Sequence, residues 1–390
     1  MSFLKRKTKK NGKKAVDSIP VDTSYKFYSG RAAYLNKEYC LVLDFRHSRK
    51  LHKINTQTGK IAQQFTLDEK LWAEKIYTTL YNGDAKKVSK SLKARQLYLK
   101  KDRIFGEQEF KPENITIKNN RTLLSVMFHL PFINTEGDTL RKNTKVLFQL
   151  NDSLQITDYW VAPIQHLEGD FYIPTISDMN PLLLIGDTVC LPVAYIHYAV
   201  TPSKKYNYAK FILDKNHTVK FHSYLPFTVP EDKGGITGDY NVVNMYLLKY
   251  GEQIAGSYIT FPAIYNLTTN TKIDDIELLG RSKQLKNKMD SVLFANDVNG
   301  LKFMIYYFER YNDKYYIMQC KNGAWNIFII YDNNFKKVQT VFYSPTTEDK
   351  GIAFYAKDGL IYFRKFGVKE DSDMYIVKWD INNLLDMEMD

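Results

Sequence analysis

The sequence predicts an all-β protein, a β-propeller of six blades with one short helical insertion. Three observations lead to this prediction. The 390 residues include 29 Tyr and 23 Phe, and aromatic residues favour the pleated, half-buried surfaces of strands. A unit of two alternating apolar runs around a polar turn recurs along the chain, as in repeat architectures. Strands do not alternate regularly with helices, which argues against Rossmann and TIM-barrel folds.

One copy of the unit is the hairpin KLHKINTQTGKIAQQF at 50–65. Asn55 ends its first alternating run, and Thr58 and Gly59 lie in the polar tip. An Asx side chain suits this place because it hydrogen-bonds the backbone of the turn. Further copies occupy 145–160, 208–225, 261–278, 326–343 and 373–390, and the exit run of the last copy is degenerate. Their Asx residues are Asn151, Asp214, Asn266, Asp332 and Asp380.

A second strand–turn–strand element precedes these hairpins. It is clearest at 33–45, 182–196, 246–261 and 353–366. Two consecutive hairpins make four antiparallel strands, which is one propeller blade. The repeat therefore predicts six blades.

The first gap in the repeat is too long for a single blade. Asn55 and Asn151 are 96 positions apart (151 − 55), whereas a blade of this kind takes roughly 40 to 50 residues. The excess lies in residues 68–102, in or after the first blade. A seventh, degenerate blade around 104–130 is the main alternative to a six-bladed ring.

The residues at 68–102 have a helical pattern. Trp72, Ile76 and Leu80 are spaced i, i+4, i+8, which places them on one face of a helix. The sequence Asn-Gly-Asp at 82–84 then breaks the pattern. We expect two short helices joined by a turn.

Positive charge is concentrated in two segments. The net charge is +12; residues 1–14 carry +7 and residues 84–103 carry +6, so the rest of the chain carries about −1. A nucleic-acid groove requires basic residues spread over one folded face, so we expect no nucleic-acid partner. We divide the chain into a basic flexible tail, 1–24, and a single propeller domain, 25–390. A strand near 25–27 is expected to pair with the last blade and close the ring.

Nothing in the sequence predicts a membrane span or a reactive thiol. No run of eighteen apolar residues exists, so we expect no transmembrane segment, and no apolar stretch typical of a signal peptide follows the basic N-terminus. Cys40, Cys190 and Cys320 are far apart, lack zinc-ligand spacing and lie in apolar runs. We expect them to be buried and inert.

The hairpins LHKINTQTGKI and MYIVKWDINNL and the element AKDGLIYFRKF resemble six-bladed propellers of the TolB-like and NHL-like kind. The residue usage is similar to that of uncharacterised propeller lipoproteins of Bacteroidetes. The resemblance covers about residues 25–390 and implies a cell-envelope protein without known catalysis. The sequence departs from those lipoproteins because no lipobox cysteine stands near its start.

Common catalytic motifs are absent from the sequence, so we assign no catalytic residue, no metal site and no cofactor. Two polar stretches are candidates for ligand binding. The stretch 166–181 contributes His166, Asp170 and Tyr172, because carboxylates beside a histidine suit acid–base or divalent-metal chemistry. The glycine-rich stretch 230–241 contributes Asp239 and Tyr240 at the mouth of the central channel.

The helical insertion is the candidate for partner binding, because a propeller does not require it. Its basic residues in the second predicted helix include Lys86, Lys87, Lys90, Lys93 and Arg95. They suit an acidic protein, a phosphorylated glycan or anionic lipid.

We therefore expect a monomeric, non-catalytic propeller that binds or scaffolds a protein or glycan partner, in the cell envelope by resemblance. The alternative is a metal-assisted hydrolase, a lactonase or a glycan-active enzyme whose site lies at the channel mouth.

Overall fold

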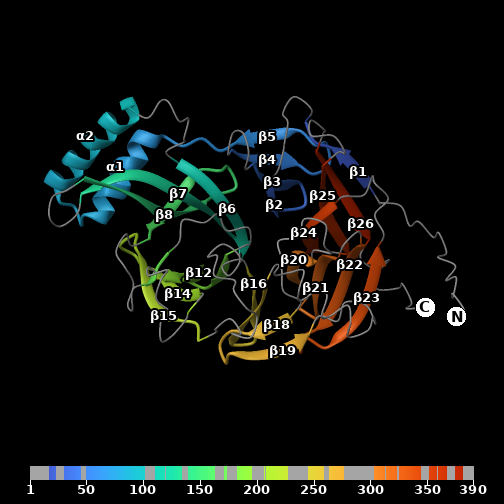
Figure 1. Ribbon diagram of the computed structural model, residues 1–390. Helices are drawn as coiled ribbons and strands as arrows, with labels where there is room; N and C mark the ends of the chain where they lie inside the picture. The colour runs from blue at the N-terminus through green and yellow to red at the C-terminus, as the bar shows by residue number, and fades with distance from the viewer. Residues whose placement is uncertain are drawn as a thin grey trace, which may run out of the picture.

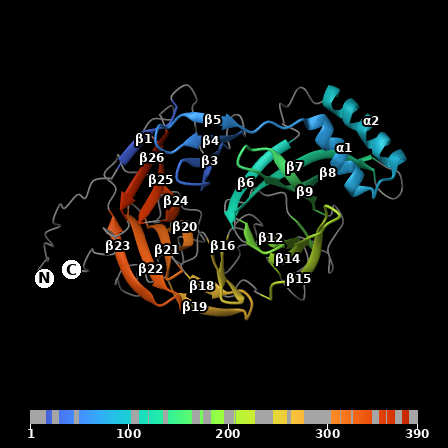
Figure 2. The same cartoon turned by 180° about the vertical axis from the view of Figure 1, so that it is seen from behind.

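Six four-stranded antiparallel sheets form a ring around one axis (Figures 1 and 2). The computed structural model describes residues 17–22, 30–44, 50–101, 110–118, 120–133, 139–162, 171–173, 182–195, 206, 208–226, 245–258, 263–275, 303–311, 313–322, 325–343, 351–357, 359–366 and 374–380. The prediction of an all-β propeller with six blades is confirmed.

The first three blades are each built from consecutive strands in order from the axis to the rim. The first blade comprises β2 (Gly30–Tyr34), β3 (Tyr39–Asp44), β4 (Leu51–Asn55) and β5 (Ile61–Gln64). The second comprises β6 (Phe110–Lys118), β7 (Arg121–Ile133), β8 (Thr139–Leu150) and β9 (Ile156–Val161). The third comprises β11 (Leu183–Ile185), β12 (Thr188–Pro192), β14 (Tyr208–Leu213) and β15 (Val219–Tyr224). A separate pair consists of β10 (Phe171–Tyr172) and β13 (Ala194–Tyr195).

The remaining blades follow the same order, except that the last takes its outermost strand from the N-terminal part of the chain. The fourth blade comprises β16 (Met245–Tyr250), β17 (Gln253–Tyr258), β18 (Ala263–Asn266) and β19 (Thr271–Asp275). The fifth comprises β20 (Phe303–Tyr311), β21 (Tyr315–Asn322), β22 (Trp325–Asp332) and β23 (Lys337–Tyr343). The sixth comprises β24 (Gly351–Lys357), β25 (Leu360–Phe366), β26 (Met374–Asp380) and β1 (Asp17–Pro20).

Strand β1 closes the ring by pairing antiparallel with β26. The backbone N–H of Val21 donates to the carbonyl of Met374 at 2.7 Å, and that of Asp22 donates to the carbonyl of Gly59 at 2.9 Å. The closing strand therefore lies within the segment 1–24 that we assigned to a tail, and it precedes residues 25–27, which lie outside the described residues. Because β1 supplies the fourth strand, the last hairpin does not need an exit run of its own.

The alternative of a seventh blade around 104–130 is wrong. Strands β6 and β7 form the inner hairpin of the second blade, and β8 pairs directly with β7 over its whole length. The inner turn at 119–120 is too short to show an Asx anchor, so the sequence pattern did not join this hairpin to its blade.

The outer turns explain why the Asx residues recur. The side chains of Asn151, Asp214 and Asp332 each accept a hydrogen bond from the backbone N–H two residues on, at 3.0, 3.1 and 2.8 Å. Asn55 and Asn266 do the same, at 2.9 and 3.0 Å. An Asx side chain thus replaces a backbone acceptor at the point where each chain reverses.

Three of these turns place a non-glycine residue in the left-handed region, three positions after the Asx. The φ angles are 52° at Leu154, 59° at His217 and 57° at Phe335. Leu154 and Phe335 are buried, whereas His217 is half-buried. The third blade therefore has a polar, partly exposed side chain where two equivalent turns bury an apolar one.

The predicted insertion forms two helices between β5 and β6, α1 (Glu69–Leu80) and α2 (Ala85–Lys101). In Figure 1 they lie outside the ring, beside the second blade. Helix α1 packs on α2 and β9, and α2 packs on β7. The prediction of a helical insertion after the first blade is confirmed.

The core lies between neighbouring blades and continues under the helices. One cluster joins Leu41 of the first blade, Val126 and Phe148 of the second blade, and Trp72 and Ile76 of α1. Burying a large apolar side chain stabilises the fold by about 1.5–3 kcal/mol. The helical pair is therefore part of the same core as the blades it covers.

Candidate functional site

The loop residues proposed as ligands are not brought together within the described part of the chain. His166, Asp170, Asp239 and Tyr240 lie outside the described residues. Tyr172 belongs to β10, where its backbone is in register with Ala194 of β13. These five residues therefore stay a prediction, and the helical pair is the candidate site whose geometry can be followed.

The sequence starts α1 with a capping residue. The carboxylate of Asp68 accepts a hydrogen bond from the backbone N–H of Leu71 at 3.0 Å, and Glu69 lies in the first turn. Both negative side chains lie near the positive end of the helix dipole. The second helix begins in the same way, because Asp84 accepts from the backbone N–H groups of Lys86 and Lys87 at 3.1 Å each.

Aromatic side chains anchor α1 on the second blade. The ring of Trp72 lies edge-on to Phe148 and Tyr159, with centroids 4.9 and 5.2 Å away. Tyr77 is buried, and its hydroxyl donates to the carbonyl of Pro131 at 2.7 Å. These contacts hold α1 in one orientation because each buried ring also has a fixed polar or aromatic partner.

Helix α2 presents two chemically different faces. Val88, Ser91 and Arg95 are buried on the side that packs on the propeller, and the hydroxyl groups of Ser91 and Tyr81 lie 2.8 Å apart. The side chains of Lys86, Lys87, Lys90 and Lys93 are exposed. Arg95 is only 7% exposed and faces away from these lysines, so we leave it out of the candidate surface.

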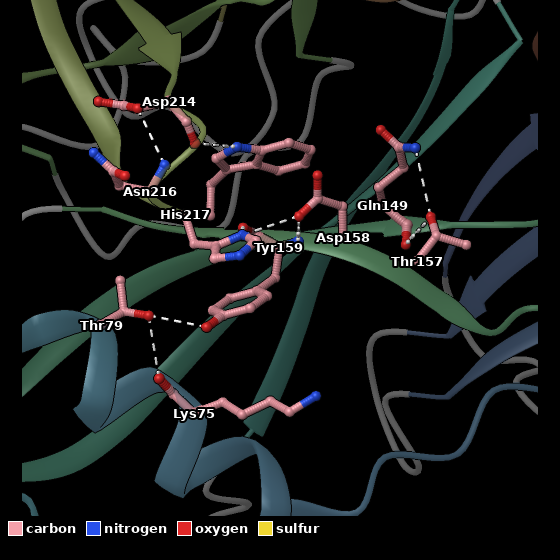
Figure 3. A network of polar contacts seen from close by, with 10 residues as sticks. Lys75, Thr79, Gln149, Thr157, Asp158, Tyr159, Asp214, Asn216 and His217 are labelled. Atoms are coloured by element: carbon pink, nitrogen blue, oxygen red, sulfur yellow. Dashed lines mark hydrogen bonds and ion pairs between the residues drawn. The ribbon is translucent and has the colours of Figure 1, made fainter. Parts of the chain in front are cut away.

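A network of polar contacts joins α1 to the second and third blades (Figure 3). The Oγ1 atom of Thr79 lies 3.0 Å from the hydroxyl of Tyr159 on β9. Tyr159 stacks on His217 of the β14–β15 turn, with centroids 4.4 Å apart and planes 8° apart. The Nδ1 atom of His217 lies 3.0 Å from Oδ1 of Asp158.

This network is a joint between elements. The indole N–H of Trp160 donates to the carbonyl of Asp214 at 3.1 Å, and the backbone N–H of Val161 donates to the carbonyl of His217 at 2.8 Å. The described residues add no nucleophile or third metal-ligating side chain to the Asp158–His217 pair, and they contain no group of three potential metal ligands anywhere. The network therefore fixes the helical pair relative to two blades.

An ion pair crosses the axis of the ring. The Nζ atom of Lys118 on β6 lies 3.8 Å from Oε1 of Glu309 on β20. These strands are the innermost strands of the second and fifth blades, which face each other across a ring of six. Both residues lie near the strand ends that lead into short turns, so the pair narrows that end of the axis.

The cysteines and the helices match two further expectations. Cys40, Cys190 and Cys320 are buried and free, and burial raises the pKa of each thiol to about 12. A thiol that stays protonated is a poor nucleophile and a poor metal ligand. Neither helix in the described residues is long and apolar enough to cross a membrane.

Sequence patterns could not reveal the network around Tyr159. Its members come from α1, the second blade and the third blade, and they meet only when the ring assembles. One signal did exist, because His217 occupies a turn position that holds Leu154 and Phe335 in equivalent turns. A polar residue at a repeated apolar position marks a contact that the repeat alone does not require.

Several solved structures align with most of this chain at very low identity. A DUF4221-family protein from Bacteroides vulgatus is 11% identical, with a TM-score of 0.49, and the alignment covers 94% of this chain and 97% of that one. A luciferin-regenerating enzyme is 9% identical, with a TM-score of 0.41, over 93% and 94% of the two chains. A protein of unknown function from Bacteroides caccae is 7% identical, with a TM-score of 0.30, over 75% and 90%.

No family model matches the chain, and no curated protein matches it. The structural similarities assign neither a family nor an activity, because function depends on a site and not on a shared fold.

Proposed function

We propose that this protein is a non-catalytic binding propeller that uses its helical pair to hold a protein or glycan partner. The observation that carries the proposal is the contrast between anchoring and necessity. All six blades form without any strand from the insertion, yet Trp72 and Tyr77 bury the insertion firmly against the second blade. The ring is then the rigid platform, and the exposed side of α2 is the binding element.

The resemblance to propeller lipoproteins supports a role in the bacterial cell envelope. A monomer is sufficient for this role, since one ring carries the whole helical pair.

The direct test replaces residues 68–102 with a short Gly-Ser linker and compares capture of partners from a native extract. We expect the intact protein to retain a partner that the replaced protein does not. Circular dichroism and a thermal melt would show whether the shortened ring still folds. If it does not, the full-length variant with Lys86, Lys87, Lys90 and Lys93 changed to Glu serves in its place. Equal capture by intact and altered proteins would contradict the proposal.

A catalytic site at the channel mouth is the second candidate, favoured by the Lys118–Glu309 ion pair. That pair narrows one end of the axis, so a ligand would enter from the other end. The connections that contain His166, Asp170 and Asp239 join strand ends on that other side. A metal-assisted hydrolase, lactonase or glycan-active enzyme should turn over a panel of lactones or glycans, and Asp170→Asn or Asp239→Asn should abolish turnover. Turnover that survives both substitutions would contradict this candidate.

A further inference from the structure

The outer face of α2 carries a straight row of four side chains. Lys86, Lys90, Lys93 and Leu97 are spaced i, i+4, i+7 and i+11, and at 100° per residue they lie within one narrow stripe. We call these four residues the lysine stripe. The opposite face of the helix packs on β7, so the stripe points away from the propeller.

Leu97 makes this stripe more than a solvated charged face. It is 61% exposed, more than Val338 at 48%, Leu71 at 46% or Ile212 at 38%, the other exposed large hydrophobic residues of the described chain. A single exposed leucine on a surface is ordinary. A leucine in line with three lysines on a rigidly anchored helix is a combination that a charged apolar partner can fit.

The charge of the stripe is not balanced by acidic neighbours. Within the described residues, Lys86 and Lys93 have no carboxylate within 4 Å, and Lys87 beside the stripe reaches Asp84 only at 4.0 Å. Residues 84–103 carry a net charge of +6. A partner that brings carboxylates to this face would therefore meet uncompensated positive charge.

We propose that the lysine stripe binds an acidic, amphipathic helical segment of a partner protein. Carboxylates of the segment pair with Lys86, Lys90 and Lys93, and one apolar side chain covers Leu97. The stripe spans eleven residues, roughly 16 Å at 1.5 Å per residue, which about three turns of a partner helix match. This inference rests on the proposed function, since it names the partner chemistry for the same helical pair.

A protein segment fits this surface better than a lipid bilayer does. A helix that binds at a membrane interface turns a broad apolar face towards the acyl chains. The apolar face of α2, with Val88 and Leu92, packs towards the propeller. One outward leucine gives lysines a point of contact with a protein but leaves little to insert into lipid.

The experiment measures binding of a designed helical peptide, with glutamates flanking one leucine, to the full-length protein. The test variants are Lys86→Glu/Lys90→Glu/Lys93→Glu and, separately, Leu97→Ser. The matched control, Lys215→Glu/Lys220→Glu/Lys336→Glu, makes the same charge change at exposed positions of other blades. Fluorescence anisotropy of labelled peptide gives the affinities at low and physiological salt.

We expect the stripe reversal to weaken binding at least about 30-fold, since three charge pairs are each lost and replaced by repulsion. Leu97→Ser should weaken binding about fivefold to tenfold, because a buried leucine contact is lost without any change in charge. The control triple variant should lose less than about threefold at physiological salt, where the screening length is about 8 Å.

Three outcomes would overturn the inference. Equal loss in the stripe and control variants would mean that only net charge matters. No effect of Leu97→Ser would remove the amphipathic element. Stripe-dependent binding to phosphatidylcholine–phosphatidylserine vesicles, without binding to the peptide, would assign the surface to a membrane.

The same variants separate this inference from the proposed function. If a partner captured from extract depends on residues 68–102 but is unaffected by the stripe reversal and by Leu97→Ser, the helical pair binds by other chemistry and only the inference fails. If capture does not depend on the insertion at all, the proposed function fails.

Discussion

Tyr331 is fully buried at the interface of the fourth and fifth blades, and its hydroxyl makes no hydrogen bond with the rest of the chain. Burial and the nearby carboxylate of Asp274 raise the pKa of this phenol, so it stays neutral at any physiological pH. A buried hydroxyl without a partner loses its hydrogen bonds to water and gains nothing in return. Tyr331 therefore packs well through its ring and poorly through its oxygen.

We expect Tyr331→Phe to leave stability unchanged or to raise it by about 1 kcal/mol, because only the unsatisfied hydroxyl is removed. The matched control is Tyr316→Phe in the same cluster, whose hydroxyl donates to the carbonyl of Lys249 at 3.0 Å. That substitution should cost about 1 kcal/mol. Urea denaturation measures both, and a larger loss for Tyr331→Phe than for Tyr316→Phe would contradict this account.

His52 links stability to pH at the seam between the first and sixth blades. Burial lowers its pKa from 6.5 to about 4, although the carboxylate of Asp44 opposes the shift. Between these two values the unfolded chain binds a proton that the folded chain does not. The free energy of unfolding should therefore fall as the pH drops from about 6.5 towards 4.

His52→Gln should remove this part of the pH dependence, worth about 3 kcal/mol at most. Denaturant titrations between pH 7 and pH 4.5 would show a shallower decline in the variant than in the parent chain. His222→Gln, at an exposed position of β15, is the control and should leave the decline as it was. Parallel curves for the parent and His52→Gln would show that another group is responsible.

At the scale of elements, the β4–β5 turn does more than reverse the chain. Gly59 has φ +71°, and a Cβ atom built on it would lie 1.8 Å from the carbonyl oxygen of Pro20 in β1. Only a residue without a side chain allows the closing strand to lie this close. The turn of the first blade thus holds the strand that completes the sixth.

Gly59→Ala should cost at least about 2 kcal/mol, because left-handed backbone strain adds to displacement of β1. Gly251→Ala separates the two effects, since Gly251 has φ +58° and open space where a Cβ would lie. It should cost about 1 kcal/mol from backbone strain alone. Thermal melts of the two variants test the difference, and equal melting temperatures would mean that β1 shifts without cost.

The helical pair should be able to open without unfolding the ring. Trp72→Ala removes the aromatic anchor of α1, and we expect faster amide hydrogen exchange across α1 and α2 with little change in the inner strands. Leu71→Ala changes the neighbouring residue, which is 46% exposed, and should leave exchange as in the parent chain. Uniformly faster exchange in every blade would show instead that the pair and the ring unfold together.

At the scale of the whole molecule, the ring depends on contact between the two ends of the chain. Removing residues 1–22 deletes β1, and Val21 with it, from the edge of β26. We expect a clear fall in melting temperature and partial recovery when a peptide of residues 15–23 is added, because the peptide can restore the ladder with β26. A truncated protein that melts like the parent chain would contradict a stabilising role for β1.

The sequence predicted the parts of this fold that repeat and not the parts that occur once. The Asx residues identified the outer hairpins because each turn needs the same side-chain acceptor. The closing strand was misplaced because β1 has only four residues and no period to detect. The helices were found because Trp72, Ile76 and Leu80 share one buried face.

The candidate site was predictable in part. The lysines of α2 were named from composition, but Arg95 was grouped with them because charge alone does not show which side of a helix packs inward. Leu97 was not singled out, since its exposure depends on how α2 lies on β7. The joint at Tyr159 and His217 depends on the packing of two blades, which no local pattern encodes.

The pairing of β1 with β26 also sets an order on biosynthesis. A ribosome makes β1 first and β26 last, so the first strand must wait through nearly the whole of translation for its partner. During that time Ile19 and Val21 have nothing to cover them, and the sixth blade cannot form. Contacts this distant in sequence form slowly, and unpaired strand edges invite aggregation. A nascent chain stalled before its final blade is therefore the form of this protein most in need of a chaperone.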